Sequence, residues 1–128
     1  MAKTYAQVVG VVLLLLGIVG LVAGETILFN LVNVTIFEDI THLVTGAILA
    51  YFGFTRDNAA TRPVAGVLGV LYLLVGILGF VSPTLFGILP ANLPYTVADN
   101  IVHLALGVLG IATGFLMGAG EATTPART

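Results

Sequence analysis

The chain has 128 residues, of which 59% are hydrophobic and only 8% are charged. Soluble domains average about 25% charged residues, and a soluble fold of this length could not bury so much apolar surface. The formal net charge of −2 provides no basic field for a nucleic acid. Because the chain has no cysteine, it forms no disulfide, thiolate metal site or iron–sulfur cluster. The composition therefore predicts an integral membrane protein without nucleic-acid partners.

Four apolar stretches are each long enough to cross a bilayer as a helix, which needs about 20 mostly apolar residues. In chain order they cover residues 5–24, 36–54, 63–81 and 97–118. We therefore expect one all-α domain over residues 1–118, with four transmembrane helices in a four-helix bundle. Residues 119–128, rich in Thr and Ala, are expected to form a disordered tail.

The connections between these stretches differ in charge. Every Lys and Arg lies in the N-terminus, the central connection or the tail, at Lys3, Arg56, Arg62 and Arg127. The positive-inside rule puts these segments, and so both chain ends and the tail, on the cytoplasmic side. The connections at 27–37 and 84–95 are apolar, interrupted by Asn or Pro, and too short to span again. We expect them at the outer interface.

The second half of the chain resembles the first. One constant offset relates two sets of glycines, Gly10, Gly17 and Gly20 and then Gly69, Gly76 and Gly79. Residues 38–46 (EDITHLVTG) likewise match 99–107 (DNIVHLALG). Each repeat, about 5–54 and about 63–118, holds two spans, which predicts a parallel repeat whose copies enter the membrane from the same side. The third span copies the first, which argues against the alternative that the first is a cleaved secretory signal.

Small residues follow a histidine along the second and fourth spans. Lipid tails give apolar helices no hydrophobic reason to associate, so small residues that let backbones approach must supply the contact. Helical spacing places His42, Gly46, Ala50 and Gly53 on one stripe, and His103, Gly107, Gly110 and Gly114 on another. Both histidines are therefore expected at one depth near the outer interface, on the protein-facing sides of their helices.

A dense group of polar residues lies at the start of these two spans: Glu38, Asp39, His42, Asp99, Asn100 and His103. Helical spacing puts Glu38 over His42 and Asp99 over His103 at i,i+4. Acidic residues in a first turn are favoured by the helix dipole, and Asp or Asn can cap a helix. The simplest interpretation is structural, with capping residues and histidines that hold the packing and no cofactor.

Two binding functions are alternatives to this interpretation. The first is a divalent metal held by Glu38, Asp39, His42, Asp99 and His103. The spacing Asp39-x-x-His42 places a carboxylate and an imidazole on one ion inside a bundle, although the second copy has Asn100, a poorer ligand, in place of Asp39. The second is a b-type haem between His42 and His103. The small-residue stripes argue against it, because they favour helices too close for a macrocycle.

The sequence contains no pattern that predicts an enzyme. There is no Ser/His/Asp arrangement, no P-loop and no dinucleotide fingerprint after a strand. Transporters are typically built from inverted repeats with a polar midplane site, whereas this repeat is parallel and its midplane nearly nonpolar. We therefore expect a structural or interaction subunit whose partners are the lipid bilayer and another membrane protein or a second copy of the chain.

Three features carry a resemblance to a known family: residues 99–110, the His42-Leu43-x-x-Gly46 copy, and the glycine-rich first and third spans. With these features the chain resembles the bacterial "domain of unknown function 4383" family of small four-span membrane proteins, from about residue 10 to residue 118. The resemblance implies a four-span topology in a prokaryotic plasma membrane. It implies no activity.

Overall fold

The computed structural model describes residues 1–117 and consists mainly of four helices. The expected tail at 119–128, including Arg127, and the last residue of the fourth span lie outside the described residues. The elements are, in chain order, α1 (Ala2–Ala23), β1 (Thr26–Leu28), β2 (Val32–Val34), α2 (Ile36–Thr55), α3 (Asn58–Val81), α4 (Val97–Ile111) and a π-helical turn, η1 (Ala112–Leu116). The four predicted helical stretches are thus confirmed as helices.

Three of the helices are long and apolar enough to cross a membrane: α1, α3, and α4 taken together with η1. Helices of this length and composition are typical of membrane proteins. The remaining helix, α2, has a comparable length of 20 residues. It is less apolar because its first two turns contain Glu38, Asp39 and His42.

The third helix begins at Asn58, not at Pro63 as predicted. Asp57 caps this helix, since its Oδ1 accepts a hydrogen bond of 2.8 Å from the Ala60 N–H. Proline lacks an N–H and therefore removes one backbone hydrogen bond near the start of the helix. The capped first turns compensate for this loss, so the connection from α2 to α3 is much shorter than predicted.

The expectation of an all-α fold needs one correction. The connection between α1 and α2 contains a small antiparallel hairpin in which Thr26 pairs with Val34 and Leu28 with Val32. At its turn, Phe29 and Asn30 have φ values of 54° and 53°, and the Leu31 N–H donates to the Leu28 carbonyl over 2.9 Å. Three residues, 29–31, join the strands. The two central residues of the turn both have positive φ, which matches the twist of paired strands and lets this short connection form a hairpin.

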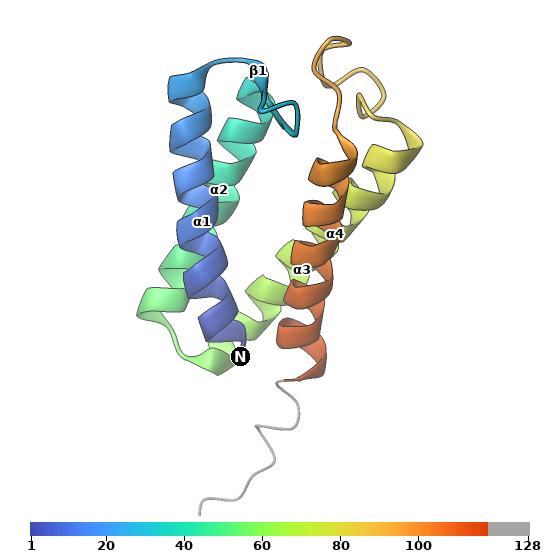
Figure 1. Ribbon diagram of the computed structural model, residues 1–128. Helices are drawn as coiled ribbons and strands as arrows, with labels where there is room; N and C mark the ends of the chain where they lie inside the picture. Colours follow the sequence, from blue (N-terminus) through green and yellow to red (C-terminus); the bar gives the residue numbers. More distant parts are fainter. Residues whose placement is uncertain (118–128) are drawn as a thin grey trace, which may run out of the picture.

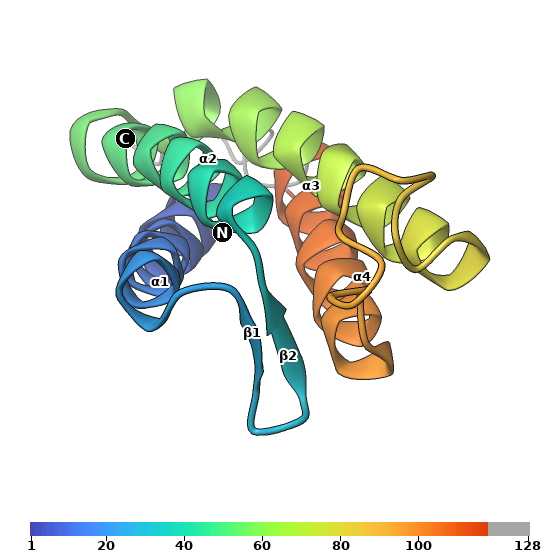
Figure 2. The same ribbon diagram turned by 90° about the horizontal axis from the view of Figure 1, so that it is seen from above.

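The helices lie in two antiparallel pairs, α1 with α2 and α3 with α4 (Figure 1). The hairpin and the connection from α3 to α4 lie at the same end of the molecule (Figure 1), the end that faces the reader in Figure 2. The N-terminus and the turn between α2 and α3 lie at the opposite end (Figure 1). The fold thereby gathers the basic residues within the described chain, Lys3, Arg56 and Arg62, at one end.

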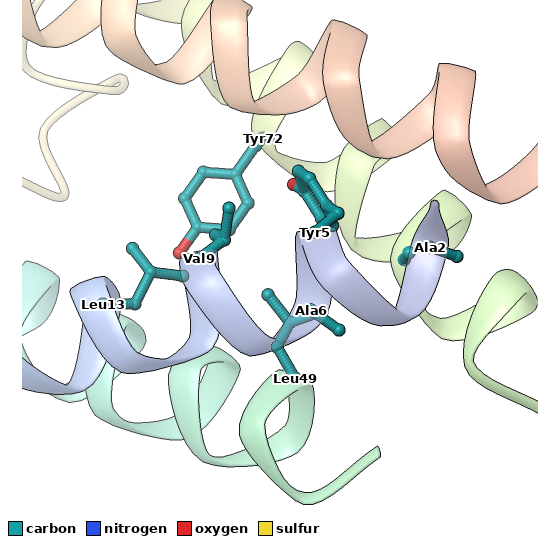
Figure 3. Packing of buried hydrophobic residues seen from close by; sticks show 8 residues of the cluster. Ala2, Tyr5, Ala6, Val9, Leu13, Leu49 and Tyr72 are labelled. Carbon is teal, nitrogen blue, oxygen red and sulfur yellow. The ribbon is translucent and has the colours of Figure 1, made fainter. Parts of the chain in front are cut away.

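A hydrophobic core joins the two pairs near the basic end. It consists of Ala2, Tyr5, Ala6, Val9, Leu13, Leu49, Ala65 and Tyr72, most of them on one face of α1 (Figure 3). Tyr5 also donates a 2.8 Å hydrogen bond from its hydroxyl to the Leu106 carbonyl of α4. The α1–α2 pair is therefore fixed against the α3–α4 pair at this end.

Within each pair the backbones touch at glycine. A Cβ on Gly10 of α1 would lie 2.5 Å from the Ala50 backbone nitrogen of α2, and a Cβ on Gly107 of α4 would lie 2.5 Å from the Leu73 backbone nitrogen of α3. Neither neighbour is a flexible side chain that could move aside. The predicted role of small residues in close helix packing is therefore confirmed at these positions.

Substituting Gly107→Ala should destabilise the fold by about 1–3 kcal/mol, the usual cost of forcing an extra carbon into a packed site. Denaturant unfolding in detergent, followed by circular dichroism, measures this change. Val108→Ala is the matched control, because Val108 is 56% exposed on the same turn of α4. Equal stability of the two variants would contradict the backbone contact.

Candidate functional site

Three polar side chains meet between the two helix pairs, at the end that holds the hairpin and the connection from α3 to α4. They are Glu38 and His42 from α2 and His103 from α4, and one ligand-type atom from each lies within 4.8 Å of the others. The His103 Nε2 is 4.0 Å from the Glu38 Oε1. The equal depth that the sequence predicts for the two histidines thus brings both into one group with a carboxylate.

The N-terminal caps of α2 and α4 position this group. Thr35 caps α2 and Thr96 caps α4, each accepting from the backbone N–H three residues later. In α4, Asp99 completes a capping box by accepting from the Thr96 N–H. Glu38 has the same position in α2, and glutamate is a favoured residue for that box. Its carboxylate faces His103 instead.

Two members of the group are almost fully buried and incompletely hydrogen-bonded. Glu38 is 4% exposed and His103 is 6% exposed. Neither the Glu38 Oε2 nor the His103 Nδ1 has a hydrogen-bond partner. Each such atom costs about 1–3 kcal/mol and is uncommon in folded proteins. The group therefore has unused capacity to bind a ligand.

Two tyrosines border the group, and sequence reasoning assigned neither of them to it. The Tyr95 ring stands edge-on to the His103 ring with centroids 5.1 Å apart, and the Tyr72 ring lies 5.9 Å from it. The Tyr72 hydroxyl is 2.7 Å from the Thr45 hydroxyl. Burial raises the pKa of Tyr95, and the negative charge of the nearby Glu38 carboxylate raises it further. The Tyr95 phenol therefore stays protonated beside that carboxylate.

His42 lines several cavities, of which two also border other members of the group. The first, of about 270 Å³, is lined by Glu38, His42, Tyr72 and Tyr95 together with apolar residues of α2 and α3. The second, of about 200 Å³, is lined by His42, Asp99 and His103 among residues of α1 and α4. Each member of the three-residue group therefore borders open space of at least the size of a few water molecules.

The remaining predicted site residues lie outside the three-residue group. Asp39 was one of the candidate metal ligands beside His42, but its carboxylate packs against Gly20 of α1, and Asn100 packs in the same way against Gly79 of α3. The Asp99 Oδ2 accepts hydrogen bonds from the Thr96 N–H at 2.8 Å and the Asn33 N–H at 3.1 Å. Asp99 thus ties the hairpin to the start of α4. Helical spacing alone could not decide whether Glu38 or Asp39 faces the histidines, because the two residues lie four and three positions before His42 and both spacings bring side chains together.

Replacing Asp99 by Asn should loosen the hairpin, because a neutral amide oxygen accepts hydrogen bonds more weakly than a carboxylate. We expect the free energy of protection of the Asn33 amide against hydrogen exchange to fall by about 1 kcal/mol, the difference between a charged and a neutral hydrogen bond. Hydrogen exchange followed by mass spectrometry on the full chain in nanodiscs measures this. Glu25→Gln, an exposed change in the same connection, should leave the protection unaltered; equal effects would contradict the tie.

Comparison with known proteins gives one match. No curated protein and no solved structure matches the chain. The model of a family described as "Domain of unknown function (DUF4383)" matches residues 1–55, which comprise α1, the hairpin and α2. Residues 99–110, on which much of the predicted resemblance rests, lie beyond the matched range. Over residues 1–55 the chain is therefore matched to the domain of unknown function 4383 family, as its sequence predicts.

Proposed function

We propose that the protein is a four-span integral membrane protein of a prokaryotic plasma membrane, with both chain ends in the cytoplasm. We further propose that it serves there as a structural or interaction subunit. The family match contributes no activity. The distribution of apolar and polar side chains on the helices carries the membrane part of this proposal.

The helix α2 is the proposed span that is not among the three helices apolar enough to be candidate spans by composition. Its outward side chains are large and apolar from end to end: Ile36, Phe37, Ile40, Val44, Ile48, Tyr51 and Phe54 are each at least 39% exposed. Its acidic residues Glu38 and Asp39 are buried. Because α2 packs along α1, which is a candidate span, a bilayer around α1 also surrounds the outer face of α2. Inward polar and outward apolar residues are typical of helices in lipid.

The orientation rests on the contacts of the N-terminus. The Lys3 backbone N–H donates to the Asn58 Oδ1 over 3.0 Å, which ties the N-terminus to the start of α3. Lys3, Arg56 and Arg62 then lie on one side of the membrane, and cationic connections favour the cytoplasm.

The parallel repeat is supported by equivalent packing in the two pairs. Gly20 receives the side chain of Asp39, and Gly79 receives the side chain of Asn100. These residues are equivalent in the sequence repeat. We therefore propose that the α1–α2 pair and the α3–α4 pair are two copies of one unit, related by an axis along the membrane normal.

Cysteine labelling tests four spans against three, and the chain has no cysteine of its own. Leu31→Cys, Ala59→Cys and Ala91→Cys each lie at an exposed position in or next to a connection. With four spans, a membrane-impermeant maleimide labels positions 31 and 91 on intact cells and position 59 only after permeabilisation. If α2 does not cross, position 59 is labelled from outside and position 91 is protected, which would contradict the proposal.

The interaction role is supported by two phenylalanines on the outer connections. Phe29 is 91% exposed and Phe86 is 72% exposed. Their φ values of 54° and 58° are unfavourable for a residue with a side chain, and such strain often marks functional positions. The two residues are also equivalent in the repeat, because Leu28-Phe29-Asn30 and Leu85-Phe86-Gly87 precede its two matched stretches. We propose that they contact a neighbouring membrane protein or a second copy of the chain.

A photo-crosslinking amino acid placed at position 29 or 86 should give adducts of defined mass with another protein or with the chain itself in living cells. Position 54 is the control. Phe54 is 61% exposed, lies at the C-terminal end of α2, away from the hairpin, and by this proposal faces lipid. Lipid adducts alone at positions 29 and 86, as at 54, would rule out the interaction role at these residues.

A further inference from the structure

We propose that Glu38, His42 and His103 bind one divalent transition-metal ion, with Zn²⁺ the preferred occupant, between α2 and α4. This site goes beyond the proposed structural role, which requires no ion. Two imidazoles and one carboxylate form a known zinc ligand set that leaves a fourth position open. The inference rests on how these three side chains are placed, buried and supported.

The geometry suits an ion of this size. Zinc bonds of about 2.0–2.2 Å to nitrogen and oxygen place neighbouring ligand atoms roughly 3–3.5 Å apart. The present atoms lie within 4.8 Å of one another, and His103 and Glu38 are 4.0 Å apart. Small side-chain rotations close that difference. Because Glu38 and His42 come from one helix and His103 from the other pair, the ion would join the two pairs.

The orientation of the Glu38 carboxylate supports an ion site independently of the distances between the ligand atoms. At its position after Thr35 a glutamate normally completes a capping box, as the equivalent Asp99 does. Glu38 instead turns into the protein interior, where its Oε2 has no hydrogen-bond partner and the His103 Nδ1 has none either. A local rule of sequence is thus broken at a buried position, which is expected at functional sites.

The same carboxylate decides between a metal ion and a haem. In a bis-histidine haem the porphyrin ring occupies the space around the line between the two imidazoles. Here the Glu38 carboxylate lies within 4.8 Å of both histidine ligand atoms and takes part of that space. Hard cations such as Mg²⁺ and Ca²⁺ prefer oxygen ligands, whereas imidazole favours zinc, copper and nickel.

The surroundings supply what a bound ion needs. Tyr95 lines the same cavity as Glu38 and His42, and its phenol there can orient the carboxylate, as residues around metal ligands usually do. Tyr72, held near the Thr45 hydroxyl, and Tyr95 restrict the His103 ring. Asp99 lines a cavity together with both histidines, and its negative charge offsets part of the charge of the ion. The two cavities beside His42 leave space for a fourth ligand.

Co²⁺ and Zn²⁺ binding to the full chain tests the proposal. The protein is purified in detergent with a tag free of histidine and stripped with a chelator. We expect one Co²⁺ per chain with the intense visible bands of tetrahedral coordination, displacement of Co²⁺ by Zn²⁺, and a thermal midpoint that rises with Zn²⁺ concentration because the ion binds the folded state. Absence of saturable binding in the unaltered protein would overturn the proposal without any variant.

Variants then assign the ligands. Glu38→Gln, His42→Gln and His103→Gln should each weaken Co²⁺ binding by at least about tenfold and abolish the Zn²⁺-dependent rise in the thermal midpoint. Asp39→Asn is the matched control, because the equivalent position holds Asn100 in the same contact with glycine, and it should bind as the unaltered protein does. Unchanged binding in the three ligand variants, or equal loss in Asp39→Asn, would show that these residues do not form the site. Circular dichroism confirms that each variant compared is folded.

Discussion

The close approach of paired helices at glycine is the constraint on which the rest of the structure depends. Lipid gives apolar helices no hydrophobic reason to associate, so backbone proximity and side-chain packing must hold each pair together. At Gly10 and Gly107 there is no room for a methyl group. The same contacts fix the register between helices and therefore the height at which α2 and α4 begin. Packing along the helices thus positions the polar end of the fold, where Gly20 receives Asp39 and Gly79 receives Asn100.

The interface between the α1–α2 pair and the α3–α4 pair, the seam of the fold, is apolar at one end and polar at the other. At the basic end, the core around Tyr5, Leu13 and Leu49 joins the pairs through apolar contacts. At the other end the pairs meet through Glu38, His42 and His103, and the hairpin is tied across by the hydrogen bond from Asn33 to Asp99. Buried polar groups in such surroundings are costly unless each is satisfied. The polar end is therefore the part of the seam whose stability depends most on what its side chains bind.

Much of this arrangement could be predicted from sequence. Apolar runs about 20 residues long predict helices, and the repeat predicts that His42 and His103 lie at one depth. The hairpin was missed because an apolar segment of this length predicts neither strand nor helix until its turn is seen, with Phe29 and Asn30 both at positive φ. Tyr95 was missed because it comes from an irregular connection, held by a 2.8 Å hydrogen bond from its N–H to the Pro83 carbonyl. No periodic pattern describes such a contact.

The choice between Glu38 and Asp39 shows most clearly where sequence reasoning ends. Both carboxylates lie about one turn before His42, Glu38 at i,i+4 and Asp39 at i,i+3, so the spacing made both of them candidate partners. The structure assigns Asp39 to Gly20, where a glycine leaves room for a short polar side chain. Glu38 is one position earlier and one methylene longer, and it extends across the seam to His103. Its counterpart Asp99 is shorter and is used in the cap of α4. The two similar halves thus contribute two histidines but a single carboxylate to the three-residue group. Asp99 is hydrogen-bonded in the capping box of α4, whereas the Glu38 carboxylate takes no part in the cap of α2 and faces His103.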